Sequence, residues 1–172
     1  MRSHGSRLLT RPLGFTLVEM LAILAVVAIL ATLAVPSYLD RIVREQIKAA
    51  LPLTDIVKQP IAASWSLNQS FPADNAGAGV PAADKIVSNY VASVSVSAGS
   101  INVTFGNRAN KTIAGKVLSL RPAVVEDAPI VPIAWVCGNA EPPAKMTLKG
   151  QNLTNIPDAL LPMECRSLTN GR

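Results

Sequence analysis

The most informative segment of this chain is FTLVEMLAILAVVAILATLAV, residues 15–35. It contains a single charged residue, Glu19. As an α-helix it would extend about 31 Å, close to the thickness of the hydrocarbon core of a bilayer. Three arginines precede the segment, and basic residues favour the cytoplasmic side of a membrane. The sequence therefore predicts a transmembrane helix over residues 15–36, with its N-terminus in the cytoplasm.

Glu19 distinguishes this segment from simpler apolar helices. A cleaved secretory signal, a plain membrane anchor or a buried core helix would each explain an apolar run, but none needs a carboxylate at its fifth position. A charge at bilayer depth is costly and usually marks function. Cleavage between Gly14 and Phe15 would create an α-amino group four residues from Glu19. The amine of one subunit could then pair with the carboxylate of its neighbour, which predicts helices that assemble side by side.

The string GFTLVE, residues 14–19, resembles the class III signal of type IV pilins. In that family a prepilin peptidase cuts after the glycine and methylates the new N-terminal phenylalanine. The resemblance implies that residues 1–14 are a leader peptide and that Gly14 is the cleavage residue. It also implies that Phe15 is the N-methylated N-terminus and that Glu19 is the assembly carboxylate.

The resemblance also implies a function. The chain would be a structural subunit of a type IV pilus, a surface filament used for adhesion, motility or DNA uptake. Its precursor would cross the inner membrane once, in contact with lipid, and its partners would be other pilin subunits, the prepilin peptidase and the assembly machinery of that membrane. The alternatives are a type II secretion pseudopilin and, from another class, a membrane-anchored hydrolase or binding protein.

The residue inventory argues against an enzyme. The sole histidine, His4, lies in the expected leader, which removes Ser-His-Asp and Cys-His catalysis and most zinc sites. Two cysteines alone cannot complete a four-ligand metal site. We therefore predict no catalytic residue, no metal site and no cofactor.

The basic charge of the chain does not by itself indicate a nucleic-acid surface. Without residues 1–14 the net charge falls from +5 to +2, because three arginines leave with them. Much of the excess positive charge therefore belongs to the basic flank of the apolar segment, which sets the orientation of that segment in the membrane. Arg108, Lys111 and Lys116 cluster between expected strands, but a solvated turn explains them equally well, so DNA remains a possible partner without support.

Residues 37–67 continue the helix with an amphipathic pattern. Apolar residues recur every three to five positions on one face, at Leu39, Ile42 or Val43, Ile47, Ala50, Val57, Ile61 and Trp65. Pro36 matches a proline that the pilin helix carries near this point, and it predicts a kink. The resemblance implies an assembly role for Pro36, since the stretch before such a proline can unwind in filaments; the alternative is that it only marks the exit from the bilayer. Pro52 and Pro60 should each cost about 3 kcal/mol in a helix interior. We therefore expect further kinks and an end of the helix near Lys58.

The remainder predicts a loop and a sheet. Residues 68–88 are rich in Gly, Ala, Pro, Asn and Asp and are expected to form an αβ-loop. Residues 89–138 should form an antiparallel sheet with strands at Tyr90–Ser97, Ile101–Phe105, Lys116–Val125 and Ile130–Cys137. Pro122, Pro129 and Pro132 suggest strand edges or ends. The expected class is α+β, the pilin fold: a long N-terminal helix, half transmembrane and half amphipathic, packed on roughly four antiparallel strands.

Cys137 and Cys165 enclose a proline-rich C-terminal segment. Two cysteines in an exported chain are expected to pair. Closing a loop of about 29 residues should stabilise the fold by roughly 3.5 kcal/mol. The resemblance implies that residues 137–165 are the disulfide-bounded D-region, which in pilins contributes to subunit contacts and adhesion. Pseudopilins commonly lack this C-terminal disulfide. A purely structural bridge is the alternative.

Overall fold

A computed structural model describes residues 14–167, without the side chains of residues 33–37. The expected leader therefore lies outside the described residues, except for Gly14. The chain divides into two compact units, the first ending at Tyr38 and the second beginning at Leu39.

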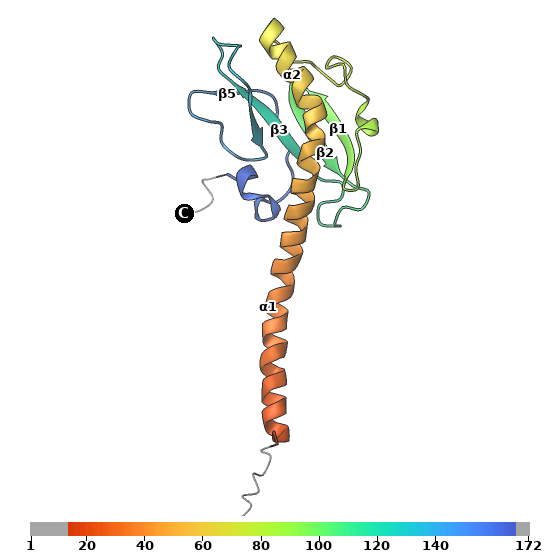
Figure 1. Ribbon diagram of the computed structural model, residues 1–172, viewed down its shortest axis with the longest axis vertical. Coiled ribbons are helices and arrows are strands. Elements are labelled where there is room, and N and C mark those ends of the chain that lie inside the picture. Colours follow the sequence, from red (N-terminus) through yellow and green to blue (C-terminus); the bar gives the residue numbers. More distant parts are fainter. Residues whose placement is uncertain (1–13, 168–172) are drawn as a thin grey trace, which may run out of the picture. The chain divides into compact units, whose positions relative to one another are not determined.

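The first unit is the N-terminal part of one helix. Helix α1 (Leu17–Ala50) begins in this unit, ends in the second, and keeps its helical backbone at Pro36 (Figure 1). Every side chain described from Phe15 to Thr32 is exposed. Within the described part of the chain, no helix has both the length and the apolar character needed to cross a membrane.

In the second unit the helical path changes at Pro52 but continues past Pro60. The last turn of α1 passes into a 3-10 turn (Leu51–Thr54) that contains Pro52, and α2 (Asp55–Asn68) follows. The prediction of a helix end near Lys58 is therefore wrong, because α2 continues for ten residues beyond it.

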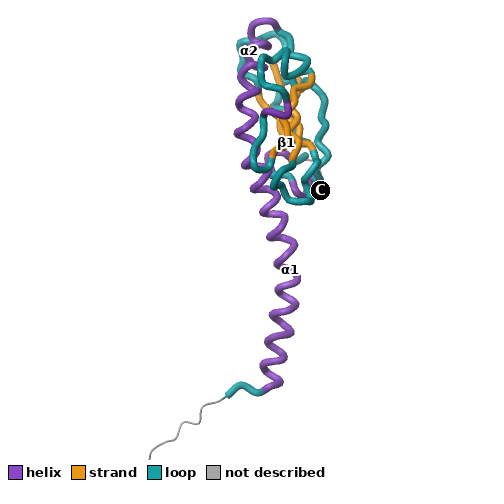
Figure 2. Tube along the Cα trace, turned by 90° about the vertical axis from the view of Figure 1, so that its right-hand side faces the viewer, coloured by secondary structure: helices purple, strands orange, loops and turns teal. Residues whose placement is uncertain are grey.

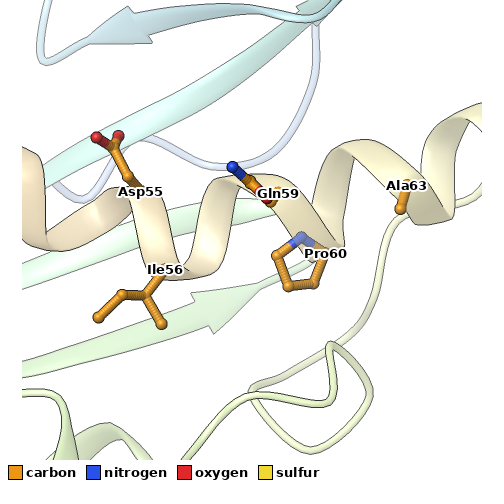
Figure 3. A pocket seen from close by; sticks show the side chains of 5 residues that line it. All are labelled: Asp55, Ile56, Gln59, Pro60 and Ala63. Atoms are coloured by element: carbon orange, nitrogen blue, oxygen red, sulfur yellow. The ribbon is translucent and has the colours of Figure 1, made fainter.

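The surroundings of Pro60 explain why α2 tolerates it. Proline has no N–H, so the carbonyl of Ile56 loses its helical donor. Ile56 is 53 % exposed and lies on the same side of α2 as Pro60 (Figure 3), where water can reach that carbonyl. Asp55, Gln59 and Ala63 join these two residues around a pocket of about 640 Å³. Val57 and Ile61 are fully buried, and their packing holds the helix together despite the proline.

The sheet is an antiparallel meander in the order β1-β2-β3-β4. Its strands are β1 (Val91–Ser97), β2 (Ser100–Phe105), β3 (Val117–Val124) and β4 (Ala134–Cys137), and a short β5 (Thr147–Leu148) also pairs with β3. The four predicted strands are present. The last is shorter than predicted, because it begins only after Pro132, and β5 is too short to leave a pattern in the sequence.

Pro122 lies inside β3 and does not mark its end, contrary to the prediction. Its carbonyl oxygen accepts a hydrogen bond from the Lys149 N–H at 2.9 Å. The N–H and C=O of one strand residue point toward the same neighbouring strand. The missing N–H of Pro122 would therefore also face the side of β3 on which Lys149 lies. There the pairing with β2 stops at Leu120 and the pairing with β5 starts at Ala123. The proline therefore lies between the two pairings, and its missing N–H removes at most one hydrogen bond, at the end of the β3–β5 ladder.

The hairpin between β1 and β2 turns through two residues with left-handed backbone. Ala98 has φ 46° and Gly99 has φ 82°, as a tight hairpin turn requires. A Cβ on Gly99 would lie 2.6 Å from Cγ of Phe71, and the Phe71 ring stacks on Trp65 with centroids 4.9 Å apart. Glycine is therefore required both by the turn and by the close approach of the chain that follows α2.

The helices cover one face of the sheet with the predicted stripe (Figure 2). The buried positions follow helical spacing and are Val43, Ile47, Ala50, Val57, Ile61 and Trp65. They join valines, isoleucines and Phe105 of the strands in a single core. Leu39 was expected in this stripe, but it is 48 % exposed.

The outer edge of β1 is closed by one side chain of the αβ-loop. Nδ2 of Asn75 donates to the Val94 carbonyl at 3.0 Å, and Oδ1 accepts from the Val96 N–H at 2.7 Å. Nδ2 also donates to the carbonyl of Pro81 at 2.9 Å, within the loop itself. One amide thus satisfies edge groups of the strand and fixes the loop upon it.

Replacing Asn75 with alanine is expected to lower the free energy of unfolding by about 2 kcal/mol, because it leaves two strand groups without these partners. Thermal unfolding of the purified full chain in detergent measures the change. Asn89→Ala is the matched control, because that exposed side chain makes no hydrogen bond to the described residues. Equal stability of the two variants would contradict the assigned role.

Candidate assembly site

The start of α1 is fixed by two side chains that cap each other. The N–H and the Oγ1 of Thr16 both donate to Oε2 of Glu19 at 2.8 Å. The N–H of Glu19 contacts Oγ1 of Thr16 at 3.3 Å in return. This reciprocal pattern is a capping box, with threonine at the N-cap and glutamate three residues later. This capping box was not predicted from the sequence, although the T-x-x-E spacing before an apolar run is its signal.

The capping arrangement leaves part of the Glu19 carboxylate open. Both bonds from Thr16 reach the same oxygen, and among the described residues no donor bonds to Oε1. The carboxylate is exposed and follows Phe15 by four residues, and Gly14 and Phe15 are exposed as well. A Cβ added to Gly14 would meet nothing within 4 Å. The first turn therefore combines an accessible peptide bond with an anion that can accept a cation from another chain.

The helix beyond this turn presents an apolar surface without a partner in the described chain. Large side chains exposed by nearly half or more occur on all of its sides, at Leu17, Val18, Met20, Leu21, Ile23, Leu24, Val26, Val27, Ile29 and Leu30. An exposed apolar surface of this extent marks a lipid or protein contact. Among the residues of its unit that the structure describes, none covers these side chains.

The second candidate feature is the segment between Cys137 and Cys165, which form a disulfide with their Cα atoms 4.6 Å apart. Side chains and backbone of this segment also bond to β3. Asn155 exchanges two bonds with the backbone of Val117, at 2.7 and 3.1 Å. Oγ of Ser119 accepts from the Leu153 N–H at 2.8 Å and donates to buried Asn102 at 2.7 Å. The segment is therefore held along its length and not only at the disulfide.

Two arginines add contacts to the same segment. Arg44 on α1 donates from Nη2 to the Ala159 carbonyl at 3.2 Å, which connects the helix to the C-terminal segment. Arg121 donates from Nη2 to the Gly138 carbonyl at 3.1 Å, while its buried Nε has no hydrogen-bond partner among the described residues. Burial lowers the pKa of the Arg121 guanidinium, which nevertheless stays charged at neutral pH. Both cations act here as donors to backbone carbonyls.

Comparison with known families agrees with these features. The prokaryotic N-terminal methylation motif matches residues 10–35, and the pilin family, described as a bacterial filament, matches residues 43–166. The chain belongs to the pilin family. The predicted family and the predicted α+β class are thereby confirmed, and the pilin is a structural subunit of a filament at the cell surface.

Named relatives of the pilin are filament proteins of two genera. The type IV major pilin protein PilE1 of Neisseria gonorrhoeae is 34 % identical over 165 residues, which cover 92 % of this chain and 89 % of the relative. A fimbrial protein of Neisseria meningitidis serogroup B is 29 % identical, with 92 % and 96 % covered. The fimbrial protein EcpC of Eikenella corrodens is 33 % identical, with 73 % and 82 % covered.

The predicted site residues fall in separate regions of the pilin. Gly14, Phe15 and Glu19 lie together at the start of α1, inside the matched methylation motif. Pro36 lies further along the same helix, and the cysteine pair lies in the second unit.

Proposed function

We propose that this pilin is a type IV pilus subunit that is processed at Gly14 and assembled through Glu19. The peptide bond after Gly14 is cut by a prepilin peptidase, and the new amino group of Phe15 is methylated. That amino group pairs with Glu19 of the neighbouring subunit. The observation that carries the proposal is the first turn of α1, where an exposed carboxylate opens an otherwise apolar and exposed helix.

Before assembly the apolar surface of residues 15–32 requires an apolar environment. We infer that the precursor resides in the inner membrane, with the arginines of its leader on the cytoplasmic side. The assembly machinery of that membrane would then transfer the helix from lipid into the filament. In the filament the neighbouring helices replace lipid as the cover for the same side chains.

Surface filaments sheared from cells and analysed by mass spectrometry test the proposal. The main polypeptide is expected to be this chain, beginning at Phe15 and carrying one methyl group on its amino nitrogen. A filament-borne chain that begins beyond Glu19 would refute the pairing, because the carboxylate itself would then have been removed with the leader.

Replacing Gly14 with serine is expected to leave uncleaved precursor in the inner membrane and to reduce sheared filaments at least tenfold. The cause would be processing and not folding, because a Cβ at this position meets no atom of the described chain. N-terminal sequencing of the chain and immunoblots of membrane fractions measure the amount of uncleaved precursor. Gly5→Ser is the control, since it makes the same change elsewhere in the expected leader. Mature chains that still begin with Phe15 would argue against a requirement for Gly14.

A further inference from the structure

The topology of the sheet gives the second unit two opposite ends with different surfaces. In an antiparallel meander, successive connections lie at alternate ends of the sheet. The connection from β2 to β3, residues 106–116, therefore lies at one end. The connection from β3 to β4, residues 125–133, lies at the other.

The first end is basic. Arg108 and Lys111 are exposed on its connection, and Lys116 is half-buried next to β3. None of the three forms an ion pair with another described residue. We call Arg108, Lys111 and Lys116 the basic end. Its positive charge is available to an external partner.

The opposite end combines an acidic group with an apolar pocket. A pocket of about 250 Å³ lies between α2 and the β3–β4 connection, and its walls include Trp65, Pro129, Ile130 and Ile133. Ile130 is 91 % exposed, and the exposed Asp127 precedes the pocket without an ion pair to any described residue. Glu126 next to it is paired with Lys149. We call Asp127 and the pocket the acidic-apolar end.

A buried donor at the same pocket also lacks a partner. Trp65 is only 7 % exposed, yet its indole N–H makes no hydrogen bond within the described chain. A buried donor normally finds an acceptor, and leaving it without one is unfavourable. The N–H itself is covered by this chain, so the apolar side chain that a second copy would cover at the pocket is Ile130.

We propose that the acidic-apolar end of one copy of this pilin docks on the basic end of a second copy. The inference rests on the proposed function, because it describes a contact inside the filament. Asp127 then faces Arg108 and Lys111 of the next copy, and opposite charges meet across the contact. The two surfaces differ and lie at opposite ends of the sheet of the second unit. Such a heterologous contact repeats without closing and builds an open filament.

Charge reversal tests the contact in the full chain. Asp127→Lys alone, and Arg108→Glu with Lys111→Glu, are each expected to reduce sheared filaments at least about tenfold, because like charges then meet. All three changes in one chain restore opposite charges at every contact, and at least half of the filament yield should return. Asp84→Lys is the control, an equal charge change on an exposed residue that belongs to neither end and pairs only with the exposed Lys85 among the described residues.

Cross-linking tests the proximity directly. Lys111→Cys and Asp127→Cys in one chain should give a ladder of linked subunits when sheared filaments react with a short bis-maleimide. The ladder should survive reduction, unlike a disulfide. Lys111→Cys with Asp84→Cys should give no ladder, because Asp84, in the 3-10 turn Ala83–Lys85, is not part of the proposed contact.

The outcomes separate this inference from the proposed function. If the wild type forms filaments and the charge variants also assemble normally, the contact alone is overturned. The same holds if the combined variant shows no recovery of the filament yield. Normal filaments with reduced DNA binding in the Arg108→Glu and Lys111→Glu variant would assign the basic end to nucleic acid and overturn the contact as well. A wild-type chain absent from sheared filaments would overturn both.

Discussion

Replacing Glu19 with valine is expected to reduce sheared filaments at least about tenfold while the amount of chain in the inner membrane stays the same. The substitution makes the helix more apolar, so insertion should not suffer. In the filament it leaves the amine of the neighbouring Phe15 as a charge without its partner, and such charges are strongly unfavourable. Immunoblots of sheared and membrane fractions, made from the same cells, measure both quantities.

The capping box supplies the control for that experiment. Glu19→Val also removes the acceptor of the Thr16 N–H, so a loss of filaments could arise from a frayed helix end. Thr16→Ala removes the threonine hydroxyl but keeps the carboxylate, at a cost of about 1 kcal/mol in helix stability. We expect that variant to assemble. Filaments lost equally in both variants would assign Glu19 to helix capping, and normal filaments with Glu19→Val would refute the pairing altogether.

Replacing Cys137 and Cys165 with serine is expected to destabilise the second unit by roughly 3.5 kcal/mol, because the unfolded chain regains the freedom of a loop of about 29 residues. For a folded unit of this size the unfolding midpoint should fall by roughly 10–15 °C. Thermal unfolding of the full chain in detergent, followed by circular dichroism, measures the shift.

Reduction of the wild-type chain is the control for the cysteine variant. Cys165 is fully buried, so a serine there adds the cost of a buried hydroxyl to the loss of the bond. Wild-type protein in strong reductant lacks only the bond. We expect its midpoint to fall by most of the same amount. A shift below about 3 °C in both samples would show that the hydrogen bonds to β3 hold the segment without the disulfide.

The N-terminal features were predictable because they depend on residues adjacent in the chain. A single charge in an apolar run, and a glycine followed by phenylalanine before it, are visible in GFTLVE. The stripe on α1 and α2 was predictable for the same reason, since helical spacing places Val43, Ile47 and Ile61 on one face. The hairpin of β1 and β2 followed from alternation and from the turn at Gly99.

The incorrect predictions concern residues whose tolerance depends on distant neighbours. Pro60 breaks an isolated helix, but the burial of Val57 and Ile61 against the sheet outweighs its cost. Pro122 is compatible with β3 only because two partner strands leave a gap beside it. The bonds of Asn75 and Asn155 join segments tens of residues apart, and no local pattern reveals them.

The amide of Asn75 also limits how one copy of the pilin can interact with another. An open strand edge invites pairing with a second chain, and crowded subunits would be prone to fuse their sheets irreversibly. With the Val94 carbonyl and the Val96 N–H already occupied, that part of β1 offers no template for such fusion. Neighbouring copies must then meet there through side chains, whose contacts form and break one at a time. Such contacts leave the sheet of each copy intact.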